Sequence, residues 1–270
     1  MPIIVAWVRL FPYINVKKMI KNRLLVMIIL TKYYKIYSMN VDDKEVQKFN
    51  DISYSWWDPE GPFKPLHMLN PVRTNFIKKN ANLDNKTILD VGCGGGLLCE
   101  SLSTDTNKII GIDMSKDAIA IAKTHQTLNK LNIDYRVNSL EELIENSDIK
   151  FDVLTCLELI EHVPDPEKLI TDCVKITNSK SDLFFSTLNR NLISYLISII
   201  GAEYILNILP KGTHDYKSFI KPSEFCRFLR NNSLEVKNIK GINYNIFNKK
   251  FYESNNTNIN YIIHCKKNNA

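Results

Sequence analysis

The sequence feature that most constrains this chain is an apolar run that ends in an acid and a cluster of glycines. It covers residues 87–96, Thr-Ile-Leu-Asp-Val-Gly-Cys-Gly-Gly-Gly, and a helix-like segment follows over 97–102. Short Val, Ile and Leu runs bounded by turn residues are typical of buried parallel strands. Glycines at the end of such a strand allow a tight turn and leave space for a ligand against the backbone. The run therefore predicts a strand, a ligand-binding turn and a helix.

A second expected strand, 108–113, ends in Asp113, about 20 residues after the glycines, which is the spacing of βαβ nucleoside sites. A carboxylate there can hold the hydroxyl pair of a ribose. A dinucleotide fingerprint requires a third glycine where Leu97 stands, so a dehydrogenase is the weaker alternative. The run 90–96 instead resembles the first motif of S-adenosylmethionine-dependent methyltransferases, an acid followed by G-x-G-x-G. In that family the glycine turn receives the aminoacyl end of the cofactor, and the acid after the second strand holds the ribose.

Alternating strand-like and helix-like segments continue through the chain. The expected helices and strands cover 115–130, 133–137, 151–156, 167–176, 183–187, 234–239 and 260–265. Repeated βα units followed by a terminal hairpin indicate an α/β fold with a doubly wound, mostly parallel sheet. We expect the Rossmann-like, seven-stranded sheet of class I methyltransferases, with a helical insertion after the fifth strand.

The charge balance argues against a nucleic-acid partner. The net charge of the 270 residues is +6, but residues 1–38 carry seven Lys and Arg and no acid. The remainder therefore has 28 basic and 29 acidic groups, so no basic footprint covers the domain. The six cysteines form no C-x-x-C pair, which indicates reduced, buried thiols in a cytosol-like compartment.

The first 38 residues differ in composition from the rest of the chain. Their apolar run, 24–30, is too short to span a bilayer, and no small-residue cleavage site follows it. We interpret 1–38 as a dispensable extension that is disordered or not part of the mature protein. A basic segment that touches a membrane is the alternative. The methyltransferase domain is expected over 39–270.

Two tryptophans and several prolines precede the glycine motif. The prolines of 55–67 disfavour regular structure, so Trp56 and Trp57 are expected either in a packed cover or in a lid over the cofactor. Further on, Asn70 and Pro71 fit a helix start, with Asn70 as the cap. This would place Arg73 early on a helix, where it could pair with a carboxylate.

An acidic cluster follows the fourth expected strand. Glu158, Glu161 and His162 have i, i+3, i+4 spacing, so in a helical turn they would share one face. Two carboxylates and an imidazole suit a divalent cation, and oxygen-rich ligation favours magnesium or manganese. The alternatives are that His162 packs under Pro164 while the glutamates face water, or that His162 acts as a general base without a metal.

From about residue 43 to 264 the chain resembles the ubiquinone biosynthesis O-methyltransferase family. The matching blocks are 56–58, 63–67, 70–73, 89–96, 155–158, 161–166, 184–190, 201–206, 210–215 and 219–222. The family usually has a Pro-Gly turn before the fifth strand, where this chain has Asn-Ser-Lys-Ser at 178–181. That departure puts the local turn in doubt, but not the chemistry.

The resemblance implies methyl transfer from S-adenosylmethionine to a catechol-type hydroxyl of polyprenylated ubiquinone precursors, 2-polyprenyl-6-hydroxyphenol and 3-demethylubiquinol. Glu158, Glu161 and His162 are implied as the catalytic residues and as ligands of a magnesium ion. Arg73 is expected on the cofactor carboxylate. The full set of expected cofactor-binding residues is Arg73, Asp90, Gly92, Gly94, Gly96, Asp113 and Leu157.

The expected insertion, 188–219, contains the strongly apolar stretch 192–209. Because a substrate with a long isoprenoid tail resides in lipid, an interfacial helix is favoured over a core helix, and the resemblance implies the same. Lys211 and Lys217 could meet anionic headgroups. We therefore expect a peripheral membrane enzyme, on the cytoplasmic face of a bacterial inner membrane or the matrix face of the mitochondrial one. Other ubiquinone biosynthesis enzymes are candidate partners.

Two further functions remain as alternatives to this assignment. The chain could be a class I methyltransferase that acts on another small aromatic hydroxyl. It could also be a non-catalytic, lipid-binding scaffold of the same pathway, which would fit the apolar insertion but leaves the acidic cluster unexplained.

Overall fold

The computed structural model describes residues 39–195 and 216–268. The elements below all belong to the compact unit Asn40–Ala270. The predicted extension, 1–38, and the central part of the predicted insertion, 196–215, lie outside the described residues.

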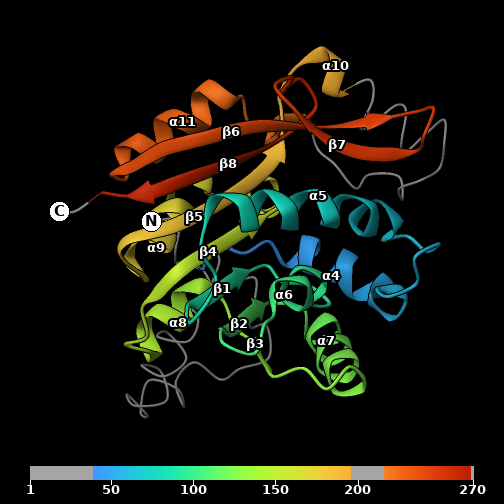
Figure 1. The fold of residues 1–270 in the computed structure, drawn as a ribbon, viewed down its shortest axis with the longest axis vertical. Coiled ribbons are helices and arrows are strands. Elements are labelled where there is room, and N and C mark those ends of the chain that lie inside the picture. The colour runs from blue at the N-terminus through green and yellow to red at the C-terminus, as the bar shows by residue number, and fades with distance from the viewer. Residues whose placement is uncertain (1–38, 196–215, 269–270) are drawn as a thin grey trace, which may run out of the picture. The chain divides into compact units, whose positions relative to one another are not determined.

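One sheet forms the centre of this unit (Figure 1), with strand order β3-β2-β1-β4-β5-β8-β6-β7. The strands are β1 (Thr87–Val91), β2 (Lys108–Asp113), β3 (Ile133–Val137), β4 (Phe151–Leu157), β5 (Thr177–Leu188), β6 (Leu234–Asn245), β7 (Lys250–Ser254) and β8 (Asn260–Lys267). The first five strands pair in parallel, whereas β8 lies antiparallel between β5 and β6. The strand order reverses between β1 and β4, which is where open α/β sheets bind ligands.

The sheet has eight strands, so the prediction of seven is wrong. The terminal hairpin is longer than expected, because β6 continues to Asn245 and pairs there with the additional edge strand β7. The stretch between 238 and 260 is rich in asparagine, which is uncommon in strands. Alternate apolar residues within that stretch, Ile242 and Tyr244, nevertheless keep the period of two that a strand requires.

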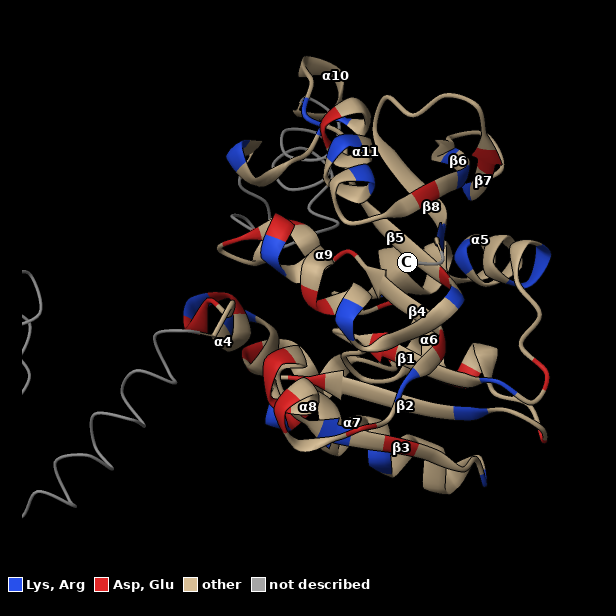
Figure 2. Ribbon diagram, turned by 90° about the vertical axis from the view of Figure 1, so that its left-hand side faces the viewer, with Lys and Arg blue, Asp and Glu red and all other residues tan. Residues whose placement is uncertain are grey.

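Helices cover both faces of the sheet. They are α4 (Asp43–Ile52), α5 (Lys64–Asn80), α6 (Leu97–Leu102), α7 (Lys116–Leu128), α8 (Leu140–Asn146), α9 (Pro166–Lys175), α10 (Leu192–Ser194) and α11 (Pro222–Asn231), with short 3-10 helices η1 (Ser53–Ser55), η2 (Ile160–His162) and η4 (Tyr216–Ser218). Figure 2 shows α5 and α9 on opposite sides of the strands.

The two faces arise from the alternation of side chains along each strand. Ile88 packs with apolar residues of α5, α6 and α7, whereas the next residue, Leu89, packs with those of α8, α9 and α11. Because successive side chains of a strand point to opposite faces, a continuous apolar run such as 87–91 supplies both cores. This is the strand type that the opening motif predicts.

Helix α5 begins earlier than predicted. It starts at Lys64, with Pro65 in the first turn, and contains Pro71 in its interior. Asn70 is therefore not its cap. The Asn70 side chain is buried and donates hydrogen bonds to the Leu97 carbonyl oxygen at 3.2 Å and to Ser101 Oγ at 2.7 Å, which fastens α5 to α6.

Two local segments between predicted elements have a defined backbone geometry. Residues 139–142 begin α8 with a capping box in which Ser139 and Glu142 bond each other's backbone N–H groups. The segment in doubt at 178–181 lies within β5, where Lys180 has a φ of 63° and the pairing with β4 shifts register. All six cysteines are free thiols and five are buried, as the sequence predicts.

Replacement of Asn70 by Ala tests the contact between α5 and α6. The variant removes both side-chain hydrogen bonds and leaves the Ser101 hydroxyl without this donor, while the Leu97 carbonyl oxygen still accepts from the Ser101 hydroxyl at 2.9 Å. We expect the free energy of unfolding to fall by about 1–2 kcal/mol after a small gain in helix propensity. The matched control is Asn75→Ala, an exposed position of the same helix. Urea denaturation should show no loss for this control, and equal losses for both variants would contradict the assignment.

Candidate active site

The turn after β1 has a backbone that only glycine adopts without strain. Gly92, Gly94 and Gly96 have φ values of 73°, 52° and 90°. A Cβ on Gly94 would lie 2.2 Å from the Trp56 ring, and one on Gly96 would lie 2.3 Å from the Tyr135 hydroxyl. Gly92 and Gly94 line the cavity described below, whereas Gly96 shapes the start of α6.

Asp113, at the end of β2, is bonded to the glycine turn. Its Oδ2 accepts from the Gly94 N–H at 2.9 Å, and its Oδ1 accepts from the Ser115 N–H at 2.8 Å. Burial raises the pKa of Asp113, although these backbone N–H groups act in the opposite direction. The contact brings the predicted ribose-binding acid next to the predicted glycine turn.

Asp90 lies beneath the same turn and is 4% exposed. Its Oδ1 accepts from the Thr155 hydroxyl at 2.6 Å, and its Oδ2 accepts from the Cys99 thiol at 3.3 Å. Burial raises the pKa of Asp90 from 3.8 to about 6, and these two hydrogen bonds offset only part of that cost. At neutral pH the buried charge of Asp90 therefore lowers the free energy of unfolding.

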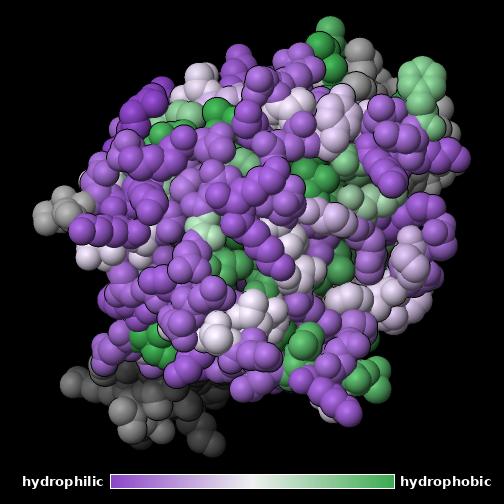
Figure 3. All heavy atoms as spheres, in the orientation of Figure 1, coloured by the Kyte–Doolittle hydropathy of each residue, from purple (hydrophilic) through white to green (hydrophobic). Residues whose placement is uncertain are grey.

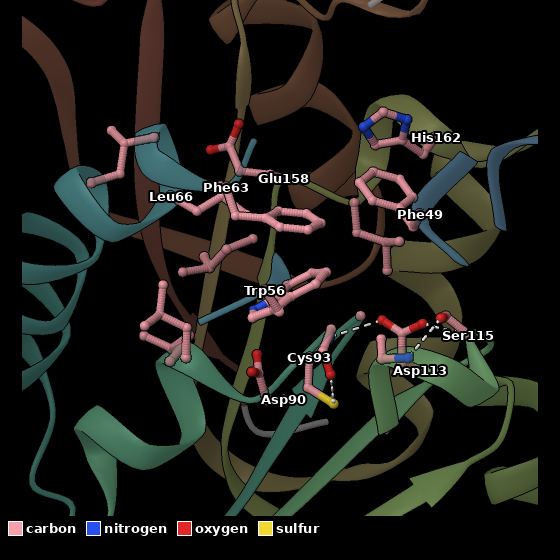
Figure 4. Close-up of a pocket in the computed structure, with 18 of the residues that line it drawn as sticks. Phe49, Trp56, Phe63, Leu66, Asp90, Cys93, Asp113, Ser115, Glu158 and His162 are labelled. Carbon is pink, nitrogen blue, oxygen red and sulfur yellow. Dashed lines mark hydrogen bonds between the residues drawn. The ribbon is translucent and has the colours of Figure 1, made fainter. Parts of the chain in front are cut away.

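The two tryptophans cover the glycine turn. The Trp56 ring lies against Gly94 and Gly95 and packs on Phe63 with 4.0 Å between ring centroids. Trp57 Nε1 donates to the Gly95 carbonyl oxygen at 3.0 Å. In Figure 4 the Trp56 ring separates the side of the cavity with Cys93, Asp90 and Asp113 from the side with Phe63 and Glu158. The segment is thus a cover over the turn, and a lid motion stays a prediction.

Arg73 projects from the middle of α5 and is 6% exposed. Its Nη2 lies 2.9 Å from Glu158 Oε1, so the carboxylate pairing expected for Arg73 is present. Nε and Nη2 nevertheless have no well-aligned hydrogen bond to any described residue. A buried guanidinium with unused donors is suited to a carboxylate ligand.

The acidic cluster does not form the helical face that its spacing predicts. Strand β4 ends at Leu157, Glu158 has a φ of 53°, and η2 begins only at Ile160. Glu158 therefore does not belong to the same helical turn as Glu161 and His162. Its Oε1 accepts from the Ser186 hydroxyl at 2.7 Å and from the Asn260 amide at 3.0 Å.

Glu161 and His162 form a second group on the cavity wall. Glu161 Oε2 accepts from the Thr187 hydroxyl at 2.9 Å, while the buried Oε1 has no hydrogen-bond partner among the described residues. Burial, followed by the charge of Glu158, raises the pKa of Glu161 to about 7. A carboxyl group in this state can accept or release a proton near neutral pH.

His162 is bonded to Glu45 of α4, with 2.9 Å between Nδ1 and Oε2. Burial alone would lower the pKa of His162, but the bond to Glu45 and the charges of Glu161, Glu45 and Glu158 raise it overall. The same bond is the main cause that lowers the pKa of Glu45 to about 2. The edge of His162 is also packed against Phe49, with 5.5 Å between ring centroids.

These contacts do not assemble the predicted metal site. In the part of the chain that the structure describes, no group of three or more His, Cys, Asp or Glu side chains is placed to hold one ion. Glu158 faces Arg73, His162 faces Glu45, and Figure 4 shows Glu158 and His162 at separate places on the wall. The residues as arranged do not fit a magnesium ion.

One cavity of about 1620 Å³ joins these groups. Every predicted site residue except Gly96 lines it: Arg73, Asp90, Gly92, Gly94, Asp113, Leu157, Glu158, Glu161 and His162. Residues of the β6–β7 hairpin line it as well, among them Ile242, Tyr244 and Phe251. Because pockets for one small ligand usually enclose about 300–1,000 Å³, this volume has room for a cofactor and a second molecule.

Four polar residues that hold the acidic cluster were not predicted: Glu45, Ser186, Thr187 and Asn260. Ser186 and Thr187 could have been found, because they lie near the end of β5, the parallel neighbour of β4, and Glu158 directly follows β4. Glu45 is 117 residues from His162 in sequence, and no local pattern marks it. Among the described residues, no helix is both long and apolar enough to cross a membrane.

Comparison with known proteins identifies the class of protein to which this fold belongs. A profile of the methyltransferase domain family matches residues 66–238. The structure of magnesium protoporphyrin IX methyltransferase from Synechocystis PCC 6803 with bound SAH is similar, with a TM-score of 0.57 at 16% identity over 76% of this chain and 85% of that one. A SAM-dependent methyltransferase from Thermotoga maritima matches with a TM-score of 0.58 at 16% identity, over 83% of this chain and 99% of that one. The chain is a methyltransferase with the Rossmann-like class I fold.

Sequence similarity narrows this class to one family. The ubiquinone biosynthesis O-methyltransferase of Azoarcus sp. (strain BH72) is 45% identical over 228 residues, which are 84% of this chain and 98% of that protein. The protein of the same name from Burkholderia vietnamiensis is 46% identical over an equal length. The chain belongs to the ubiquinone biosynthesis O-methyltransferase family, which confirms the resemblance, and it is an S-adenosylmethionine-dependent enzyme.

Replacing Asp90 by Asn removes the buried charge beneath the glycine turn. Because the folded protein binds the Asp90 proton more tightly than the unfolded chain does, the free energy of unfolding falls as pH rises from 3.8 to about 6. Above that range Asp90→Asn should be more stable than the wild type by about 2–3 kcal/mol, and near pH 4 the difference should vanish. Urea denaturation at several pH values checks this, and a pH-independent difference would contradict it.

Proposed function

We propose that the protein transfers a methyl group from S-adenosylmethionine to a catechol hydroxyl of a polyprenylated ubiquinone precursor, of the 2-polyprenyl-6-hydroxyphenol and 3-demethylubiquinol types. The observation that carries the proposal is that one cavity connects the glycine turn and Asp113 with the group formed by Glu161, His162 and Glu45. The first part suits a nucleoside cofactor, and the second suits the removal of a phenolic proton. The names of the relatives support the choice of substrate.

The cofactor supplies an activated methyl group when it is bound. The residues present fit it, because the glycine turn lets a ligand approach the backbone and Asp113 can accept from a ribose. Arg73 would hold the carboxylate of the cofactor, and its unused buried donors support that role. Asp90 and Leu157 would shape the floor of the same site.

Proton removal is assigned to His162. If Nδ1–H donates to Glu45, the imidazole is fixed in the tautomer that leaves Nε2 as the acceptor. A phenol that titrates near pH 10, as Tyr does, is mostly protonated in the cell, so a positioned base is needed. Glu161 stabilises the protonated imidazole through its charge. Phe49 packs on His162, and Phe63 and Trp56 line the same cavity, so apolar surface surrounds the proposed base.

Magnesium remains a separate hypothesis that rests on the family resemblance alone. Glu158 would have to leave Arg73, and His162 would have to leave Glu45, before the three expected ligands could meet. No step of the proposed reaction passes through a metal. The protein is also proposed to act at a membrane surface, the cytoplasmic face of a bacterial inner membrane or the matrix face of the mitochondrial one, because a polyprenyl tail partitions into lipid.

The test of function is a methyl-transfer assay with the purified full chain and a short-tailed demethylubiquinol. It is run after exhaustive chelation and again with added magnesium. Transfer supports the proposal, and a gain on adding magnesium supports the metal hypothesis. Binding of S-adenosylhomocysteine without transfer to any catechol would favour the scaffold alternative, whereas transfer only to other phenols would favour a different substrate.

Glu158 occupies the side of Arg73 that a cofactor carboxylate would need. Replacing Glu158 by Gln removes this competing charge, so we expect S-adenosylhomocysteine to bind several-fold more tightly, by about 0.5–1.5 kcal/mol. Calorimetric titration measures this. Methylthioadenosine lacks the aminoacyl group and serves as the control, with unchanged affinity. Equal changes for both ligands, or weaker binding of S-adenosylhomocysteine, would contradict the arrangement.

Replacing His162 by Asn removes the proposed proton acceptor but keeps a polar side chain beside Glu45. We expect kcat to fall by about 10²–10⁴-fold, the usual contribution of a positioned base. The affinity for S-adenosylhomocysteine should stay within about twofold, because His162 is assigned to the substrate and not to the cofactor. A fall in cofactor affinity with an unchanged kcat would refute this division of roles.

A further inference from the structure

The hairpin between β6 and β7 carries apolar side chains at its tip. In the turn 246–249, Ile246 is 71% exposed and Phe247 is 92% exposed. Turns at hairpin ends normally hold Gly, Asn, Asp, Ser or Pro, which water solvates. Two large adjacent apolar residues at such a place bury little of their surface against the described part of the chain.

The turn that presents these residues is held by its own asparagines. Asn245 Oδ1 accepts from the N–H groups of Phe247 at 2.9 Å and Asn248 at 3.3 Å, and Asn248 Oδ1 accepts from the Lys250 N–H at 3.1 Å. The backbone is therefore bonded in a defined shape. Ile246 and Phe247 are thus exposed on a turn whose backbone is held by local hydrogen bonds.

The surroundings of the tip have the composition of a lipid-contacting surface. Tyr244 is 41% exposed and Tyr252 is 47% exposed on the two strands, and the stretch 244–252 contains two lysines and no acid. Two further apolar residues, Leu192 and Ile193 of α10, are 68% and 48% exposed. Figure 1 shows α10 and β7 at the same end of the unit, and Figure 3 shows separate hydrophobic residues among hydrophilic ones at that end. Aromatic residues with lysines are favoured at membrane interfaces.

The same hairpin lines the active-site cavity. Ile242, Tyr244, Lys249 and Phe251 belong to the cavity wall, so the cavity reaches the base of the exposed tip. A molecule that extends from His162 toward this end of the cavity would reach Tyr244 and Lys249, at the base of the tip. This continuity connects the exposed apolar tip with the chemistry of the site.

We propose that the tip of the β6–β7 hairpin, residues 244–252, docks on an anionic lipid bilayer and sets the adjoining end of the cavity at the membrane surface. The lipid is the committed occupant because exposed aromatic and aliphatic side chains insert among acyl chains, while Lys249 and Lys250 meet anionic headgroups. The part of the inference that concerns a polyprenyl tail entering at this end rests on the proposed function. The docking itself does not.

The test is sedimentation of the full chain with vesicles of phosphatidylcholine and phosphatidylglycerol, without cofactor or substrate. The double variant Ile246→Ser/Phe247→Ser should lower the partition coefficient about tenfold or more, since two large apolar side chains leave the interface. The matched control is Leu128→Ser, an equally exposed apolar residue at the end of α7, at 75%. It should bind as the wild type does. Lys249→Gln/Lys250→Gln should weaken binding to the mixed vesicles but not to phosphatidylcholine alone.

The outcomes separate this proposal from the proposed function. An unchanged partition of Ile246→Ser/Phe247→Ser, or no binding of the wild type, overturns the docking even if methyl transfer occurs. A wild-type dimer in size-exclusion chromatography that the double variant converts to a monomer, with no effect on vesicles, identifies a second copy as the occupant and also overturns it. If docking is correct, the double variant keeps its kcat on a short-tailed soluble catechol and loses activity several-fold on a long-tailed substrate in vesicles.

Discussion

The hydrogen bond from the Gly94 N–H to Asp113 is the contact on which the rest of the site depends. It joins the turn after β1 to the end of β2, and the left-handed backbone of Gly92 and Gly94 makes it possible. No other residue type could hold this turn against the Trp56 ring, because a Cβ at Gly94 would fall within 2.2 Å of it. The glycines therefore have two roles. They bring the ends of β1 and β2 together, and they allow the Trp56 ring to lie directly on the backbone.

The cavity is built around buried charges, and each charge is offset by a specific neighbour. Arg73 faces Glu158, Glu45 faces His162, and Thr155 donates to Asp90. Isolated charges at such depth would cost several kcal/mol, so a site like this is stable only when its partners are in place. Glu161 is the least satisfied member, with one oxygen unpartnered among the described residues, and burial, followed by the charge of Glu158, raises its pKa to about 7. The group that is worst for stability is thus the one whose proton is most easily moved.

Local patterns predicted the fold well and the cluster poorly, for a physical reason. A buried strand, a glycine turn and an acid at the next strand end are each encoded within a few residues, so the region 87–113 was predicted correctly. The pair Asn70-Pro71 was misread as a helix start, because a cap and a buried amide look the same in sequence. The spacing of Glu158 and His162 presupposes a continuous helix, which the left-handed backbone at Glu158 interrupts. Glu45 reaches His162 only through the tertiary fold.

The two ends of the cavity differ in their access to water. At the end with Glu161 and His162, the raised carboxyl pKa depends on burial from water, and Phe49 packs against His162 there. At the hairpin end, the wall includes Tyr244 and Lys249, which lie on either side of the exposed pair Ile246 and Phe247 in sequence. In solution that end would admit water toward the charges, whereas a bilayer beneath it would replace water by acyl chains. Contact with lipid would then do more than deliver a substrate, because it would also keep the site dry enough for its proton acceptor to work near neutral pH.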